Sequence, residues 1–384
     1  MLINRRPVFD SKTTVQGYQS QTLSKTTGDR SQKELLSAIA ENIDELAGNH
    51  WAMVGLSPEA VDAGAHEVLS RDRTVVRLHG KSEDKLFQRS LGKLAAQGYR
   101  PAVSAPENGS APSEGAHIVH MSFTECDPKT LSGKVERLRE RSARVMVSGI
   151  ETHGDFNQCK ASGVDLFEGR FFCQPMPGTD ALPVTRIPTM RLLTALQNPD
   201  IRLQDLEEMV RYSLPLTYKL LNFTNSTYVG LSRSVESVKH AVGLVGIERI
   251  RKWASLLLYS TVEEKPRELF ITAAIRARMC ERLADSDDEW RQSVFFTAGL
   301  LSVLDAVLDR PMSEVVDALP LSSEVRECLV KGDGILGSTL QAVLDYENGS
   351  FDSYSLRAFH PSLVRNAYFE ALHWTRDVSN GLMI

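Results

Sequence analysis

The sequence predicts a protein of two domains: a TIM-like α/β barrel over residues 1–183 and an all-helical domain over residues 184–384. In the first half, short strand-like runs alternate with amphipathic helices, which is the pattern of a parallel sheet that closes into a barrel. In the second half, apolar residues recur at helical intervals. Prolines punctuate the segment from Pro175 to Pro188, as expected of a connector between domains.

The first half contains strand-like runs at residues 3–10, 51–56, 74–79, 100–105, 116–123, 144–150 and 166–172. Amphipathic helix candidates lie among them, at residues 33–46, 82–97, 129–141 and 154–161. The loops that follow the C-terminal ends of barrel strands are the usual location of binding and catalytic groups, so metal ligands would be expected there.

The second half is organised around residues 206–259, whose apolar spacing fits three or four short helices that each bury one face. Ser237 can cap one of these helices, and Gly246 separates two that would otherwise merge. Asn225 and Ser226 are interpreted as turn formers that bond their own backbone. Trp253 has the spacing of a core residue. Further periodic segments at residues 268–284, 293–308, 338–349 and 361–378 complete the predicted bundle.

Composition narrows the class of protein. The 384 residues carry a net charge of −5, with 42% hydrophobic and 24% charged residues, which is typical of a globular protein and argues against nucleic acid as the main partner. The five cysteines have no paired spacing, as expected of reduced thiols in a cytoplasm. No signal peptide and no apolar run long enough to cross a bilayer is recognised, so we expect a cytoplasmic protein without a membrane partner.

Three stretches of the second half resemble the HDOD domain, an all-helical relative of the HD-type phosphohydrolases. They are LTYKLLNFTNS (residues 216–226), TYVGL (227–231) and SVKHAVGLVGIERIRKW (237–253). The resemblance implies a regulatory domain, because HDOD domains lack the metal-binding His and Asp pairs of the HD family. The sequence agrees, since it contains no His-Asp dipeptide and continues from Gly299 as Gly-Leu-Leu-Ser-Val.

The first half resembles the EAL domain, a barrel that hydrolyses cyclic di-GMP with two divalent cations. The likeness is carried by RRPVFDSKTTVQGYQSQ (residues 5–21), VMVSGIET (145–152) and ASGVDLFEGRFFCQPMP (161–177). Together the two resemblances cover nearly the whole chain, in the order of the EAL–HDOD architecture. The implied fold is therefore an EAL barrel followed by an HDOD domain.

The resemblance also implies a degenerate barrel, because the expected metal and phosphate ligands are replaced. Gln19 replaces the glutamate of the motif, Leu23 replaces an arginine, Gly55 replaces an asparagine and Arg77 replaces a glutamate. Ser104 and Ala105 replace an aspartate pair, His120 and Ser122 a lysine and an aspartate, Ser148 a glutamate and Glu168 a glutamine. Glu151 alone persists near its expected place, and Arg6 stands where a glutamine would touch a guanine base. We therefore expect no metal, no cofactor and no enzymatic activity.

Two motifs that could suggest a metal site and a phosphate loop are interpreted as structural features. His117, His120 and His153 could suggest a metal site, but residues three apart on a strand point to opposite faces, so the first two cannot chelate together. The glycines at residues 332, 334 and 337 spell GxGxxG, but they follow a helical segment and not a strand, so a helix-ending turn is favoured over a phosphate loop.

The sequence-based hypothesis is a non-catalytic signalling adaptor in cyclic di-GMP-related bacterial signalling that acts by protein–protein interaction. The resemblance suggests diguanylate cyclases, phosphodiesterases or kinases as partners, and a homodimer is possible by analogy. The candidate interaction surface comprises Glu248, Arg249 and Lys252. Two alternatives stay open: a metal-independent receptor for cyclic di-GMP, and a weak residual phosphodiesterase.

Overall fold

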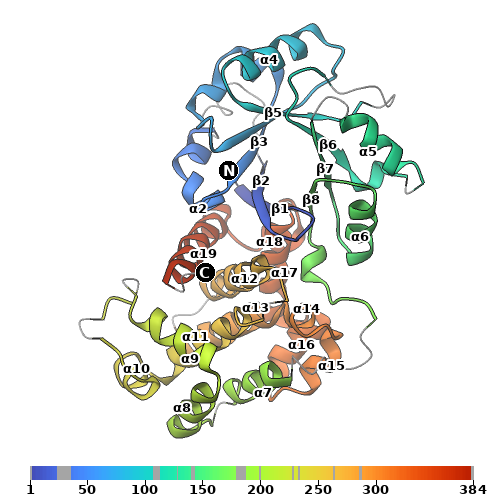
Figure 1. Ribbon diagram of the computed structural model, residues 1–384. Coiled ribbons are helices and arrows are strands. Elements are labelled where there is room, and N and C mark those ends of the chain that lie inside the picture. The colour runs from blue at the N-terminus through green and yellow to red at the C-terminus, as the bar shows by residue number, and fades with distance from the viewer. Residues whose placement is uncertain are drawn as a thin grey trace. The chain divides into compact units, whose positions relative to one another are not determined.

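The structure is a computed structural model that describes residues 2–23, 36–106, 113–127, 129–139, 143–178, 187–198, 200–226, 229–231, 234–262, 264–284 and 288–381. The chain divides into two compact units (Figure 1). The first comprises residues 1–172 with 349–351, and the second comprises residues 173–348 with 352–384. The predicted boundary between residues 183 and 184 falls in residues 179–186, outside the described residues.

The first unit is a closed barrel in which eight strands follow one another in chain order, so the predicted α/β barrel is confirmed. The strands are β1 (Leu2–Phe9), β2 (Val15–Leu23), β3 (Trp51–Leu56), β4 (Thr74–Leu78), β5 (Arg100–Ser104), β6 (Ile118–Ser122), β7 (Arg144–Ser148) and β8 (Leu166–Glu168). The predicted strand over residues 166–172 is shorter than expected, because a 3-10 turn at Phe171–Cys173 follows β8.

The first strand departs from the expected parallel sheet. β1 runs antiparallel to both β2 and β8, whereas every other neighbouring pair is parallel. The cause is the short connection between β1 and β2, which is too short for a crossover helix. Asp10 tightens this turn, because its carboxylate accepts hydrogen bonds from the backbone N–H groups of Lys12 (2.8 Å) and Thr14 (3.0 Å).

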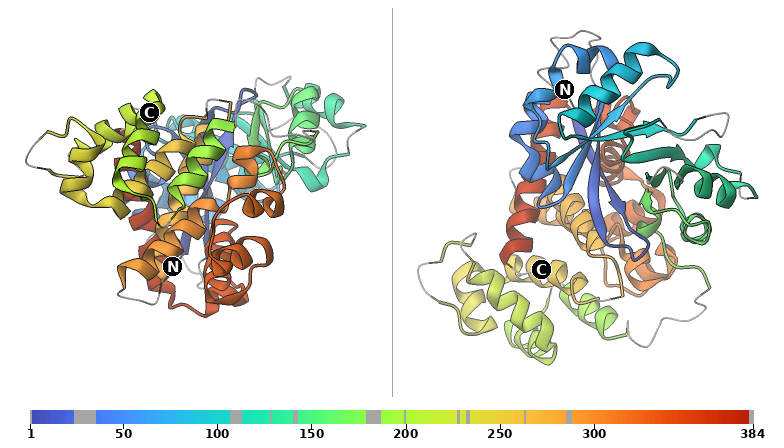
Figure 2. Two further views of the ribbon diagram at one scale, coloured as in Figure 1. Left: turned by 90° about the horizontal axis from the view of Figure 1, so that it is seen from below. Right: turned by 45° about the horizontal axis from the view of Figure 1, so that its top comes forward.

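Helices of the first unit lie on the outside of the strands (Figures 1 and 2). They are α2 (Ile43–Ala47), α3 (Pro58–Asp62), α4 (Lys85–Ala96), α5 (Leu131–Arg139) and α6 (His153–Ala161). The last three match the helices predicted over residues 82–97, 129–141 and 154–161. The helix predicted over residues 33–46 begins outside the described residues. Thr152 starts α6 by accepting a hydrogen bond from the backbone N–H of Asp155 (3.1 Å).

The second unit is helical, so the predicted all-α domain is confirmed. Its helices are α7 (Ile187–Leu196), α8 (Leu203–Tyr212), α9 (Leu214–Thr224), α10 (Val238–Val245), α11 (Ile247–Tyr259), α12 (Arg267–Leu283), α13 (Glu289–Leu301), α14 (Leu304–Leu308), α15 (Met312–Asp317), α16 (Ser323–Lys331), α17 (Gly334–Glu347), α18 (Tyr354–Arg357) and α19 (Pro361–Gly381).

The predicted stops and caps in this unit are largely confirmed. Ser237 caps α10 by accepting a hydrogen bond from the backbone N–H of His240 (3.1 Å), and Gly246, with φ of 91°, separates α10 from α11. The single helix expected over residues 293–308 is wrong, because α13 ends at Leu301 and α14 begins at Leu304. The Ser302 hydroxyl donates to the carbonyl of Gly299 (2.7 Å) where α13 ends.

Helix α12 is the core of the second unit. It is buried along most of its length and packs against α13, α17 and α19. The crossing with α13 depends on Gly299, because a Cβ atom there would lie 2.4 Å from the carbonyl oxygen of Arg276 and 2.7 Å from Cα of Ala277. Contacts with backbone atoms cannot be relieved by a rotamer change, so this close crossing requires glycine.

Within the described residues, no helix has both the length and the hydrophobicity that a bilayer-crossing segment needs.

The α12–α13 crossing yields a stability prediction. Gly299→Ala should lower the free energy of unfolding of the helical unit by about 1–3 kcal/mol, because the added methyl group forces two helix backbones apart. Gly243→Ala in α10 is the matched control, since its Cβ would meet nothing within 4 Å and alanine is the better helix former. Thermal unfolding of the full chain should therefore show a lower Tm only for the first variant. Equal Tm values would contradict the tight crossing.

Candidate functional site

Most of the residues singled out for the barrel come together on its inner face. The inward side chains of seven strands form an apolar layer made of Val8, Met53, Val75, Ala102, Ile118, Met146 and Leu166. Side chains on a strand alternate between faces, so the residue two positions further along points inward again, nearer the open end. Those positions hold Gly55, Arg77, Ser104, His120, Ser148 and Glu168, with Arg6 on the antiparallel β1. We call this set the barrel mouth.

The remaining predicted positions lie around the barrel mouth or outside it. Gln19 is buried and pairs in register with Arg6 and with Met53. Ser122 bonds the Thr124 hydroxyl (2.8 Å), and the backbone N–H of Ala105 donates to the carbonyl of His120 (2.8 Å). Leu23 ends β2, and its side chain lies outside the described residues.

Arg6 pairs with two carboxylates, Glu168 of the barrel mouth and Glu151 in the segment that follows β7. Its Nε lies 2.7 Å from Oε1 of Glu168, and one of its terminal nitrogens lies 2.9 Å from Oε1 of Glu151. Glu168 is only 1% exposed and also accepts a hydrogen bond from the backbone N–H of Gly149 (3.2 Å). Burial raises the pKa of Glu168, although Arg6 and the Gly149 N–H act in the opposite direction. Glu151, the one carboxylate that persists near its expected place, is therefore paired with Arg6.

A basic group occupies the other side of the barrel mouth. Desolvation lowers the pKa of Arg77 from its ordinary value, although the negative charges of Glu168 and Glu125 act in the opposite direction. His79, the residue directly after β4, has its pKa lowered by desolvation and by the charge of Arg77. His120 is buried, its Nε2 lies 2.9 Å from the Ser148 hydroxyl, and burial together with Arg77 and His79 lowers its pKa to about 3. His120 is therefore neutral at physiological pH.

The donor set at the barrel mouth is unsuited to two divalent cations. Magnesium and manganese prefer several carboxylate oxygens, whereas here Arg6 binds both Glu151 and Glu168 and Arg77 adds a positive charge. Across the described part of the chain, no group of three or more His, Cys, Asp or Glu side chains is placed to hold a metal ion. His117 is exposed and directly precedes β6. His153, the first residue of α6, makes a ring contact with Phe171. The three histidines are therefore not brought together in a metal-binding group.

Sequence reasoning missed two features of the barrel mouth. His79 was not singled out, although its spacing of two from Arg77 on a strand was a sufficient signal. The Arg6 ion pairs could not be found from spacing, because Arg6 and Glu168 are at opposite ends of the barrel sequence and meet only through the antiparallel pairing of β1 with β8.

A second site lies in the helical unit. A groove of about 780 Å³ is lined by residues of α10, α11, α12, α13 and α19, and we call it the α11–α13 groove. All three residues of the predicted interaction surface, Glu248, Arg249 and Lys252, line it. Trp253, read as a core residue, also lines the groove and makes an edge-to-face contact with Phe223, with ring centroids 4.8 Å apart.

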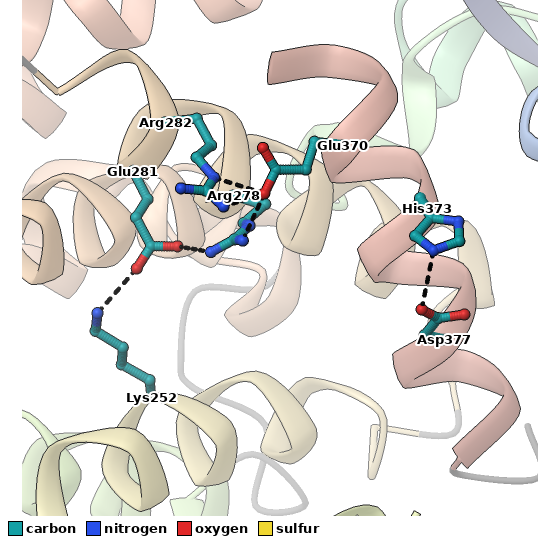
Figure 3. A network of polar contacts seen from close by, with 7 residues as sticks. All are labelled: Lys252, Arg278, Glu281, Arg282, Glu370, His373 and Asp377. Carbon is teal, nitrogen blue, oxygen red and sulfur yellow. Dashed lines mark hydrogen bonds and ion pairs between the residues drawn. The ribbon is translucent and has the colours of Figure 1, made fainter. Parts of the chain in front are cut away.

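Charged side chains connect three helices beside this groove (Figure 3). Lys252 of α11 lies 3.0 Å from Glu281 of α12, which binds Arg278 at 2.6 Å. Arg278 in turn binds Glu370 of α19 at 2.7 Å, and Arg282 binds the same carboxylate. The sequence analysis missed Arg278 and Glu281, because their partners are on helices far apart in the chain.

Aromatic side chains form the apolar part of the α11–α13 groove. Phe296 and Trp374 are in edge-to-face contact, with centroids 6.0 Å apart, and Lys252 lies 5.4 Å above the Phe296 ring. Trp290, at the start of α13, is 67% exposed, and Leu244 on α10 is 45% exposed. The sequence analysis assigned no role to Trp290, although an exposed tryptophan at a helix start is a recognisable signal of an interface.

The other interpreted motifs have structural roles. Gly332 ends α16 with φ of 72°, and Gly337 packs where a Cβ atom would lie 2.2 Å from the carbonyl oxygen of Gly332, so the helix-ending turn is confirmed. Asn225 clamps a longer loop than expected: its side chain accepts from the backbone N–H of Val235 (2.7 Å) and donates to the carbonyl of the same residue (2.8 Å). The Ser226 hydroxyl donates to the carbonyl of Phe223 (2.7 Å).

Comparison with known proteins gives a family match in the second half. Residues 182–315 match the model of the HDOD domain. The chain is 28% identical over 327 residues to the cyclic di-GMP phosphodiesterase CdgJ of Vibrio cholerae serotype O1, a match that covers 81% of this chain and 75% of that protein. It is also 28% identical over 237 residues to the uncharacterized protein YuxH of Bacillus subtilis, which covers 60% of this chain and 58% of YuxH.

Solved structures similar to the chain include EAL domains. An EAL domain protein of Listeria monocytogenes has a TM-score of 0.38 and 15% identity, covering 46% of this chain and 88% of that one. The phosphodiesterase PaMucR in complex with c-di-GMP has a TM-score of 0.38 and 13% identity, covering 46% of this chain and 97% of that one. The HDOD match within the second half and the similarity to CdgJ over most of the chain support an EAL–HDOD arrangement.

One expectation is corrected by these comparisons. The sequence analysis expected a protein without enzymatic activity, whereas the Vibrio cholerae relative, matched over 81% of this chain, is named as a phosphodiesterase. The expectation that the protein lacks enzymatic activity is therefore wrong. It rested only on the replacement of metal and phosphate ligands in one sequence, which does not establish the activity of the whole barrel.

The Arg6 ion pairs yield a prediction about stability and pH. Arg6→Leu should lower the free energy of unfolding at neutral pH by about 3–5 kcal/mol, because it leaves a buried carboxylate unpaired. In the folded protein the pKa of Glu168 is raised above its value in the unfolded chain, near 4.5. Its contribution to stability is therefore fully present below the unfolded pKa and is lost as the pH rises through the folded pKa. Without Arg6 the pKa of Glu168 rises further, so the cost should be smaller at pH 5 than at pH 8.

Denaturant unfolding of the full chain at the two pH values measures this difference. Glu151→Gln is the control, because the Glu151 side chain is 53% exposed and its loss should cost about 0–1 kcal/mol at either pH. A pH-independent cost of Arg6→Leu would show that Glu168 does not need this ion pair.

Proposed function

We propose that the protein is a regulator in cyclic di-GMP-related bacterial signalling that acts by binding other signalling proteins through the α11–α13 groove. The observation that carries this proposal is a concave groove in the HDOD-containing unit that combines exposed aromatic side chains with charged ones. The partner classes are those that the HDOD resemblance suggests: diguanylate cyclases, phosphodiesterases or kinases. Such partners would meet this chain in the cytoplasm.

The groove has the composition of a protein-binding surface. Trp290 and Leu244 expose large apolar surfaces to water, which is unfavourable unless a partner covers them. Tryptophan and arginine are the residue types that contribute most to binding at interfaces, and here Trp290 and Arg249 line the same groove. A partner that buries Trp290 would gain about 1.5–3 kcal/mol for each large apolar side chain removed from water.

The walls of the groove are held by the charged network. Lys252, Glu281, Arg278 and Glu370 fix α11, α12 and α19 relative to one another within the helical unit (Figure 3). A surface built on rigid helices binds with little loss of conformational entropy. This favours a preformed site over one assembled on binding.

The chemistry of the groove indicates the kind of partner segment. A groove between helices that is lined by both apolar and charged side chains fits an amphipathic helix whose apolar residues recur at helical spacing. Arg249 is exposed and makes no ion pair with any described residue, so a carboxylate on the partner helix would complement it. We therefore propose an amphipathic helix with at least one acidic residue as the occupant.

Hydrolysis of cyclic di-GMP is the second candidate function. It is favoured by one observation, the relationship over 81% of this chain to a protein named as a cyclic di-GMP phosphodiesterase. In this chain Glu168 of the barrel mouth and Glu151 are both bound to Arg6. A catalytic role for them would require that the substrate or its cations displace Arg6.

The proposed groove can be tested by site-specific cross-linking. A photoreactive amino acid at Trp290 should capture a partner in the native cell, whereas the same group at Tyr354, which is 91% exposed and outside the groove, should not. Combining the Trp290 cross-linker with Leu244→Asp and Arg249→Glu should reduce capture at least tenfold, because one change removes apolar contact and the other reverses a charge. Equal capture at Tyr354, or capture unaffected by these changes, would contradict the groove as the binding site.

The hydrolytic candidate has its own test. With Mn²⁺ and cyclic di-GMP, a hydrolytic barrel should release linear dinucleotide, and Glu168→Gln or Glu151→Gln should lower the rate at least tenfold. Glu136→Gln on the exposed face of α5 is the control and should leave the rate unchanged. Chromatography of the nucleotide products measures both. Product no higher than in a protein-free control would remove this candidate.

A further inference from the structure

A smaller cavity of the helical unit shares no lining residue with the α11–α13 groove. It measures about 250 Å³ and is lined by residues within the segment 259–270, from the end of α11 to the first turn of α12, and by Val307 of α14. We call it the α11–α12 pocket. At about 30 Å³ for each water molecule, its volume equals that of about eight waters, so it fits a small molecule and is too small for a nucleotide.

The wall of the α11–α12 pocket is mostly apolar. Val262, Leu269, Phe270 and Val307 line it, and all four are buried. Buried side chains of a packed core hold fixed rotamers, so this wall is formed before a ligand arrives. Lys265 also lines the pocket, but it is ion-paired with Asp309, which balances its charge. The body of a ligand in this pocket must therefore be apolar.

The hydroxyl group of Tyr259 is a buried donor without an acceptor. Tyr259 is the last residue of α11, lines the pocket and is only 4% exposed. Its hydroxyl has no hydrogen-bond partner among the described residues. Burial, together with the negative charge of Asp305, raises the pKa of Tyr259, so the phenol stays protonated at neutral pH. A buried hydroxyl without a partner is costly, and an oxygen atom of a ligand would remove that cost.

A cation lines the same pocket. Arg267, the first residue of α12, is exposed and makes no ion pair with any described residue. No side chain caps this 17-residue helix, because Pro266 is its N-cap, so the N–H groups of the first turn add to the positive potential. Glu268, in the same turn, is buried and does not line the pocket. An anion beside Arg267 would therefore be stabilised by the guanidinium and by the helix terminus.

We propose that the α11–α12 pocket binds a small amphipathic carboxylic acid that carries a second oxygen atom away from its carboxylate. Arg267 binds the carboxylate, the Tyr259 hydroxyl donates to the second oxygen, and the apolar wall surrounds the carbon chain between them. One unpaired arginine balances a single negative charge, which favours a carboxylate over a phosphate dianion. A simple fatty acid would leave the Tyr259 hydroxyl without an acceptor, and a diol would leave Arg267 without an anion.

Titration calorimetry of the full chain with ω-hydroxyhexanoate, hexanoate and α,ω-hexanediol tests the site. Saturable binding of ω-hydroxyhexanoate is expected, with each of the other two probes about fivefold weaker, because each lacks one of the two polar contacts. Tyr259→Phe should remove the preference for ω-hydroxyhexanoate over hexanoate, since it deletes only the hydroxyl. Arg267→Gln should weaken both carboxylates about fivefold and leave binding of the diol unchanged.

Two controls separate recognition from folding and from the groove. Arg357→Gln should bind all three probes as the wild type does, because Arg357 is exposed on α18 and does not line the pocket. Trp290→Ala in the α11–α13 groove should also leave binding unchanged, so failure of the groove proposal would not affect this one. No saturable binding of ω-hydroxyhexanoate, an unchanged preference in Tyr259→Phe, or wild-type affinity in Arg267→Gln would each overturn the site.

Discussion

The ion pair between Arg6 and Glu168 links the first strand of the barrel to the last. β1 is the only described strand that runs antiparallel to its neighbours, and its register places Val8 opposite Glu168. Arg6 is two residues from Val8 on the same face, so its guanidinium reaches the carboxylate at 2.7 Å. The pair thus stabilises barrel closure and lowers the cost of a carboxylate that is almost fully buried.

This pair also sets the electrostatics of the barrel mouth. Because Arg6 binds both Glu168 and Glu151, neither carboxylate is available to a cation without breaking an ion pair. Burial, together with the charges of Arg77 and His79, lowers the pKa of His120 to about 3.

Periodicity predicted the fold well. The strand over residues 51–56 has the bounds of β3, and the helices of residues 206–259 appear as α8 to α11 with Ser237 and Gly246 in the expected roles. Local signals specify such elements, because caps and turns involve residues close in the chain. The antiparallel β1 was not predicted, since alternation is the same in parallel and antiparallel strands. The break in residues 293–308 was missed because its apolar pattern is continuous.

The site residues were predicted only in part, because some depend on contacts between segments that are distant in the sequence. The resemblance to the EAL domain named Gly55, Arg77, Ser104 and Ser148, and the alternation of side chains along the strands places these four residues on the inner face of the barrel. Contacts between distant segments were not predictable: Arg6 with Glu168, or Arg278 with Glu370, depend on strand register and helix packing. The groove was found only through three residues of α11, because its other walls come from helices that the sequence does not place beside it.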